Sequence, residues 1–174
     1  MNSARGDKTE MLKVTIDTNV IIDEKKHRLL AQIKQLAEQG LIDIGVTTRV
    51  IADKDQDKNE IRKSEHLKEF SRYPKVGTVG RWGFSRWDSG DFWAGEADVQ
   101  LGNQLSKILF SKTKDKCSHN ELADIDHLAG HLHAKRDIFV TFDKDILKKR
   151  KELHEQIGIT VSSPEELVKQ FPLK

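Results

Sequence analysis

Cysteine and long apolar runs are scarce in this sequence of 174 residues. Its single cysteine, Cys117, excludes an internal disulfide framework and suits a reducing compartment. No apolar run approaches the roughly 20 residues that a membrane-spanning helix needs, and residues 1–11 lack the apolar core of a signal peptide. We therefore expect a cytoplasmic protein that has no membrane partner.

An excess of one charge is also absent, since 30 lysines and arginines face 28 aspartates and glutamates for a net charge of +2. Net charge alone therefore does not indicate a nucleic-acid ligand. The basic residues are nevertheless clustered, at Arg72, Lys75, Arg81, Arg86, Lys144, Lys148, Lys149, Arg150 and Lys151. Such runs usually form solvated helix faces, but around an acidic pocket they would attract phosphates.

Strand-like and helix-like segments alternate along the chain. The strand-like segments are residues 12–16, 41–46, 137–141 and 158–161. Helical spacing is found at residues 26–38 and 96–110 and in helices expected to begin at His119 and Pro164, each preceded by a serine in capping-box spacing. This alternation predicts an α/β/α sandwich around a mostly parallel central sheet.

The length suits one domain, which we expect over residues 12–174 after a flexible leader at 1–11. An insertion at about 54–95 interrupts it, first as a charged, exposed helix and then, over 72–95, as a glycine-rich loop or irregular hairpin with all three tryptophans. Its aromatic residues could stack on unpaired bases, but packing or a homodimer contact is the simpler interpretation. They are Trp82, Phe84, Trp87, Phe92 and Trp93.

Two acidic residues follow predicted strands directly. Asp17 ends the first strand, and Asp143 lies just beyond the strand at 137–141. Because ligands bind at the carboxyl ends of parallel strands, we expect these carboxylates to share one edge of the sheet. Their mutual repulsion would be relieved by a hard, oxygen-preferring cation such as Mg²⁺ or Mn²⁺. The pair therefore predicts a metal site.

Further acids could complete this pocket. Asp53 lies in the predicted helix after the second strand, and Asp124 and Asp126 lie in the helix that begins at His119. Helical geometry separates Asp124 and Asp126 by about 200°, so both cannot face one metal. Both flank the apolar stripe of their helix, and periodicity does not choose between them.

Three segments resemble the acidic motifs of the PIN-domain nuclease family. They are residues 14–22 (VTIDTNVII), 123–129 (ADIDHLA) and 137–143 (DIFVTFD), and their order and spacing match over roughly residues 12–162. The resemblance implies a PIN-like fold that binds Mg²⁺ or Mn²⁺ and hydrolyses phosphodiesters, most often in RNA. It favours Asp124 over Asp126. The second acidic position of the family, commonly Glu, would here be Asp53.

These observations predict a metal-dependent endoribonuclease. Its metal-binding carboxylates would be Asp17, Asp53, Asp124 and Asp143, with Asp126 and Asp145 as alternates. Asn19 and Thr141 would orient Asp17 and Asp143 through hydrogen bonds. The simpler role of Asp145 is a helix cap or first-turn acid.

Several alternatives stay open. The scaffold could bind RNA or a protein without cutting, or the substrate could be single-stranded or flap DNA. The resemblance also permits a toxin with an antitoxin-like protein partner. A phosphotransferase with a strand-end Asp nucleophile is disfavoured because Asn19 stands where a second acid is usual. His127 and His131 have a spacing that can bind zinc, but a solvent-facing or hydrogen-bonded role suits them better.

Overall fold

The computed structural model describes residues 11–22, 27–49, 59–78 and 95–171. Its strands form a parallel sheet in the order β3-β2-β1-β4-β5. The strands are β1 (Leu12–Ile16), β2 (Ile42–Thr47), β3 (Lys75–Val76), β4 (Ile138–Val140) and β5 (Val161–Ser162). Strand order reverses at β1, because the chain builds outward through β2 and β3 and then returns to place β4 on the other side of β1.

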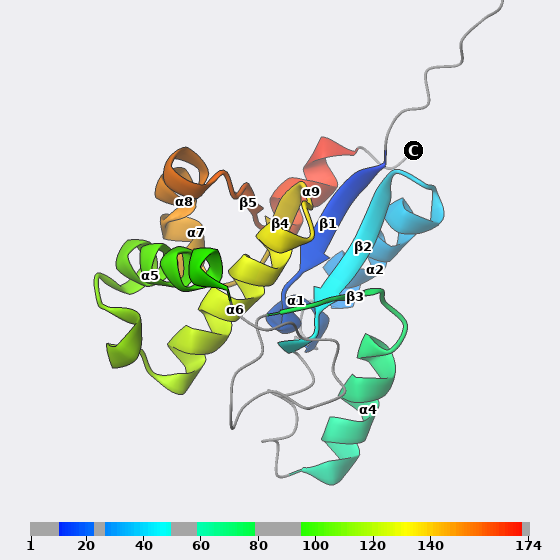
Figure 1. Ribbon diagram of the computed structural model, residues 1–174. Coiled ribbons are helices and arrows are strands. Elements are labelled where there is room, and N and C mark those ends of the chain that lie inside the picture. The colour runs from blue at the N-terminus through cyan, green and yellow to red at the C-terminus, as the bar shows by residue number, and fades with distance from the viewer. Residues whose placement is uncertain (1–10, 23–26, 50–58, 79–94, 172–174) are drawn as a thin grey trace, which may run out of the picture.

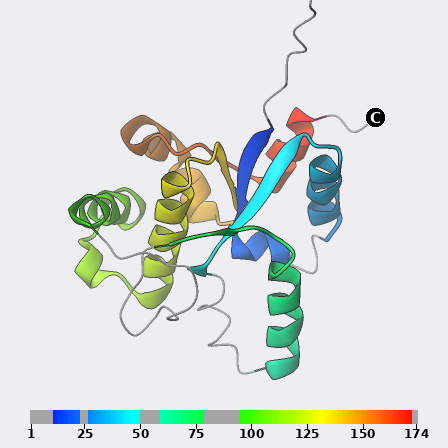
Figure 2. The same ribbon diagram turned by 45° about the vertical axis from the view of Figure 1, so that its right-hand side comes forward.

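Helices cover both faces of this sheet (Figure 1). They are α1 (Thr18–Ile22), α2 (His27–Glu38), α4 (Glu60–Phe70), α5 (Glu96–Phe110), α6 (His119–His133), α7 (Lys144–Lys148), α8 (Arg150–Ile157) and α9 (Pro164–Gln170). Figure 2 shows α2 and α9 on one side of the strands and α5 and α6 on the other, while α4 extends beyond the carboxyl end of β2. The predicted α/β/α sandwich is therefore confirmed.

Alternation along the strands divides the core into two layers. Val14 and Ile16 of β1 pack with Leu30, Ile33 and other apolar residues of the α2 and α9 layer. Phe139 of β4 faces the opposite way, and packs with apolar residues of α5, α6, α7 and α8. Successive side chains of a strand point to opposite faces, so one short strand contributes to both layers. The sheet is thereby buried on both sides.

The α6 face of the sheet carries polar side chains as well as apolar ones. Thr15, which alternates with Val14 and Ile16, is fully buried and its hydroxyl lies 2.9 Å from Nδ1 of His131 on α6. The His131 ring also packs edge-on against Phe139, with centroids 5.7 Å apart. A buried polar group needs such a partner, and this one ties α6 to the middle of β1.

The helix boundaries agree well with the sequence, and the edge strands do not. Helix 96–110 and the capping boxes at Ser118 and Ser163 are confirmed. The fourth predicted strand, residues 158–161, overlaps β5 only at Val161, since the residues paired with β4 are Val161 and Ser162. The segment expected to be a loop at 72–95 contains β3. Val46 of β2 pairs with Lys75 of β3, and the Val46 N–H donates to the carbonyl of Pro74 at 3.0 Å. Residues 79–94, with the aromatic cluster, Arg81 and Arg86, lie outside the described residues.

Across the described ranges, no helix has both the length and the apolar character needed to cross a membrane.

The buried His131 imidazole predicts a loss of stability in acid. Burial lowers the pKa of His131 to about 4 from 6.5, with Arg136 adding to the fall and Asp137 opposing it. Below about pH 6.5 the unfolded chain therefore binds a proton at His131 more readily than the folded chain does. The free energy of unfolding is highest above about pH 6.5 and decreases as the pH falls towards 4. Between about pH 7.5 and about pH 5, urea unfolding should show an extra loss of about 2 kcal/mol in the wild type relative to His131→Gln. Equal losses in both proteins would contradict this account.

Candidate active site

Asp17 and Asp143 lie at the point where the strand order of the sheet reverses. Asp17 immediately follows β1, and its backbone N–H donates to the carbonyl of Val140 at 2.9 Å across the β1–β4 pair. Asp143 follows β4 by three residues. In open parallel sheets, the crevice outside the carboxyl ends at such a switch point is the usual ligand site. The fold thus brings together the two acids that the sequence placed at strand ends.

Two side chains hold the Asp17 carboxylate on its β4 side. Its Oδ2 accepts hydrogen bonds from the Thr141 hydroxyl at 2.6 Å and from the Asn19 amide at 2.8 Å. Thr141 Oγ1 in turn accepts from the backbone N–H of Asp143 at 2.9 Å, and Asn19 Oδ1 accepts from that of Phe142 at 3.0 Å. Both contacts lock the segment after β4 to the segment after β1, so the carboxylate has one orientation.

The electrostatics of Asp17 are those of a buried acid. The residue is 6% exposed, and burial raises the pKa of its carboxyl above the ordinary value. Positive charge on His127 and hydrogen bonds from Thr141 and the Thr18 backbone oppose this rise in pKa, while the charge of Asp143 adds to it. A carboxylate held in an unfavourable environment beside a second carboxylate is the arrangement that a bound cation would relieve.

Asp143 has a structural task of its own. Its Oδ1 accepts from the backbone N–H groups of Asp145 at 2.7 Å and Ile146 at 3.0 Å, so it is the N-cap of α7. Asp145 is an exposed first-turn acid that pairs with Lys148 at 2.8 Å. Asp145, the alternate metal ligand, therefore forms an ordinary surface ion pair.

Asp124 and Asp126 have different surroundings on α6. Asp126 is 1% exposed, and its carboxylate lies 3.8 Å from Arg49, which follows β2 and is itself buried. Asp124 is half-buried and lies three residues before His127, which places these two residues on neighbouring positions of one helix face. The Arg49 contact gives Asp126 a structural partner, and Asp124 is the α6 acid that the family resemblance favours.

A divalent cation fits the chemistry of this edge, although the described residues supply only part of a ligand set. Asp17 and Asp143 offer the hard oxygen donors that Mg²⁺ and Mn²⁺ prefer. Within the described ranges, no three His, Cys, Asp or Glu side chains gather as a metal centre. Asp53, the remaining predicted ligand, lies outside those ranges.

Two polar contacts on this face of the sheet were not predicted from the sequence. His127 Nδ1 contacts the hydroxyl of Thr47, the last residue of β2, and His131 contacts Thr15. The two histidines thus join α6 to two different strands, each through a contact with a threonine hydroxyl. The signal available in the sequence was the four-residue spacing of His127 and His131 on one helix, together with threonines at strand positions 15 and 47.

The predicted basic rim is largely neutralised around α7 and α8. Lys148 pairs with Asp145, Lys149 with Glu152 and Arg150 with Glu166. Lys144 is exposed and has no ion pair within the part of the chain that the structure describes. It directly follows Asp143 in the sequence, at the start of α7.

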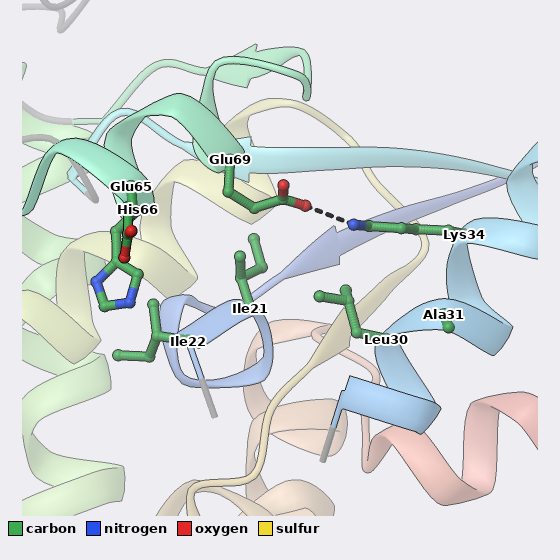
Figure 3. A pocket seen from close by; sticks show the side chains of 8 residues that line it. All are labelled: Ile21, Ile22, Leu30, Ala31, Lys34, Glu65, His66 and Glu69. Carbon is green, nitrogen blue, oxygen red and sulfur yellow. Dashed lines mark hydrogen bonds and ion pairs between the residues drawn. The ribbon is translucent and has the colours of Figure 1, made fainter. Parts of the chain in front are cut away.

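A separate cavity of about 350 Å³ lies between α1, α2 and α4. Figure 3 shows apolar side chains of α1 and α2, among them Ile21 and Leu30, opposite polar side chains of α4. Lys34 of α2 reaches Glu69 of α4 at 2.5 Å. None of the residues that line it is a predicted site carboxylate, so the cavity is distinct from the strand-end site.

Comparison with known proteins finds similarity among solved structures. No protein-family model and no curated protein sequence matches the chain. A chain in the crystal structure of VapBC2 from Rickettsia felis, bound to a DNA fragment from their promoter, superposes with a TM-score of 0.52 and 14% identity, over 87% of this chain and 98% of that chain. The VapC component of that complex has a PIN domain. The fold is PIN-like. At this identity the likeness concerns the architecture, and the PIN-like chemistry has to be argued from the residues.

Because the Asp17 carboxylate is buried, we expect its charge to lower the stability of the PIN-like domain. Asp17→Asn keeps the side-chain shape and removes a carboxylate whose raised pKa shows that folding disfavours its charged form. Near neutral pH and without metal, the variant should have a higher Tm than the wild type, whereas Mn²⁺ should raise the Tm of the wild type alone. Thermal melts followed by circular dichroism test this, with Asp145→Asn as the control. Equal Mn²⁺ stabilisation of wild type and Asp17→Asn would contradict the metal site.

The two α6 acids predict opposite phenotypes. Asp126→Asn weakens the buried contact with Arg49 and should lower the free energy of unfolding by about 3 kcal/mol, while retaining the Mn²⁺-dependent rise in Tm. Asp124→Asn should instead lose most of that rise at a smaller cost in stability. Urea unfolding and Mn²⁺-dependent melts of both variants distinguish the two. The reversed pattern would assign the site to Asp126.

Proposed function

We propose that the protein is a metal-dependent endoribonuclease that hydrolyses phosphodiester bonds at the carboxyl edge of the sheet. The observation that carries this proposal is the buried Asp17 carboxylate at the switch point, fixed by Thr141 and Asn19 and facing the charge of Asp143. The PIN-like fold and the three acidic motifs support the same reaction. A cytoplasmic location agrees with the single cysteine.

Asp17 and Asp143 would hold Mg²⁺ or Mn²⁺ directly or through water, with Asp124 and Asp53 contributing. When bound, such an ion lowers the pKa of a coordinated water and neutralises charge on the leaving oxygen. The chain's own residues supply the geometry. Thr141 and Asn19 keep Asp17 Oδ2 occupied and fix the carboxylate plane, and the Asp143 cap ties its carboxylate to the start of α7. Lys144, exposed beside Asp143, would attract a substrate phosphate.

A non-catalytic scaffold that binds RNA or a protein is the second candidate. The position of Asp53, where the resembled family commonly has Glu, favours it, because a shorter side chain changes the reach towards a metal. Single-stranded or flap DNA is the alternative substrate. The similarity to a chain of VapBC2 supports an antitoxin-like protein partner as a further proposal, and a homodimer remains an expectation from the sequence.

Metal-dependent cleavage is the decisive expectation. The wild type should cut a labelled single-stranded RNA pool with Mn²⁺ or Mg²⁺ and not with EDTA, and should cut single-stranded DNA of matched sequence more slowly. Asp17→Asn should reduce the rate by at least about a hundredfold, because removing a metal ligand should cost at least as much as removing one of its hydrogen-bonding partners. Asp145→Asn, which removes only a surface ion pair, should cut like the wild type.

Each result points to one function. Cleavage that persists with EDTA or in Asp17→Asn contradicts the proposed site. Metal-dependent cleavage of DNA in preference to RNA would change the substrate class. A folded wild type that binds RNA or a protein but cuts neither nucleic acid would establish the scaffold instead.

A further inference from the structure

The cavity between α1, α2 and α4 has an apolar wall that belongs to the core of the domain. Ile21 of α1 and Leu30 of α2 are core residues, 4% and 6% exposed, and Ile22 packs against the same core. All three line the cavity, as Figure 3 shows. Its volume of about 350 Å³ lies at the small end of the range in which proteins bind small organic molecules. The cavity therefore suits a small ligand with an apolar body.

The charges on the opposite wall are largely balanced within the protein. Glu69 of α4 accepts from Lys34 of α2 at 2.5 Å, and from Arg72 at 2.7 Å and the Tyr73 hydroxyl at 3.0 Å. In Figure 3 the Lys34–Glu69 pair bridges α2 and α4 across the cavity. Both cations of this cluster are thus engaged with one carboxylate, so neither is an available counterion for an anionic ligand.

Glu65 is the unbalanced acid of this lining. It is exposed, and it makes no ion pair or hydrogen bond with any residue that the structure describes. In Figure 3 it lies at the end of the cavity away from Lys34. An anionic or neutral ligand would cover this carboxylate without compensating its charge, which is unfavourable. A ligand with a positive charge would supply the missing partner.

We propose that this cavity binds a small organic cation, whose alkyl or aryl body packs against α1 and Leu30 and whose ammonium or guanidinium group pairs with Glu65. The apolar wall and the single unbalanced acid together select this class of ligand. An anion finds no counterion in the cavity, and a purely apolar molecule leaves Glu65 without one. The site is separate from the strand-end carboxylates, so the inference goes beyond the proposed nuclease function and does not depend on it.

Three probes that share one body and differ in charge test this site: 4-phenylbutylammonium, 4-phenylbutanol and 4-phenylbutyrate. Titrated into the ¹⁵N-labelled full chain without metal or RNA, the ammonium should bind saturably and shift the backbone amide resonances of α1, α2 and α4. It should bind about three- to fivefold more tightly than the alcohol, which is the effect expected of a solvent-exposed ion pair. The butyrate should bind most weakly.

Substitutions separate the charge from the cavity. Glu65→Gln should weaken binding of the ammonium about three- to fivefold and leave the affinity for the alcohol unchanged. Glu60→Gln makes the same change on the same helix outside the cavity, and should bind both probes like the wild type. Ala31→Phe adds a large side chain at an exposed position of the lining, and should weaken binding of both probes. Circular dichroism checks that each variant is folded.

Equal affinities for the three probes, or wild-type affinity for the ammonium in Glu65→Gln, would overturn the cation site. Resonance shifts that scatter over the surface without saturating would overturn it as well. A cavity that takes up a basic, apolar peptide but not 4-phenylbutylammonium would belong to a protein partner instead. Since these titrations contain neither metal nor RNA, failure of the cation site and failure of the nuclease are read from different experiments.

Discussion

The hydrogen bond from Thr141 to Asp17 joins the ends of β1 and β4, where the strand order of the parallel sheet reverses. Asp17 leaves β1 as a buried carboxylate, and Thr141 meets it from the end of β4 at 2.6 Å. The same hydroxyl oxygen accepts from the Asp143 backbone, so one side chain sets both the orientation of Asp17 and the start of α7. The candidate site depends on this junction, and the hydrogen bond from Thr141 opposes the rise in the pKa of Asp17 that burial causes.

The α6 face of the sheet combines packing with polar contacts. Phe139 and the apolar residues of α6 exclude water there, while Thr15 and Thr47 present hydroxyls to two histidines. A buried hydroxyl is costly unless it finds a partner, and each threonine has one on the same helix. These contacts join α6 to β1 and β2, and the Arg49–Asp126 ion pair adds a further link between α6 and the end of β2.

Stability and chemistry oppose each other at Asp17. Burial disfavours the ionised form that a metal ligand requires, and the neighbouring Asp143 adds to that cost. Proteins commonly retain such unfavourable groups where function needs them, and compensate elsewhere in the core. The apolar cores on the two faces of the sheet supply stabilising burial in this chain.

The sequence by itself determined the alternation of strands and helices, the main helix caps and the strand-end positions of Asp17 and Asp143, because all of these are local patterns. Periodicity could not choose between Asp124 and Asp126, since both flank the same apolar stripe, and the contact of Asp126 with Arg49 is visible only in the tertiary structure. The sequence also could not predict β3 or the Thr47–His127 contact. Residues distant in sequence make both, and their register is set by the packing of α6 and the sheet edge rather than by any local preference.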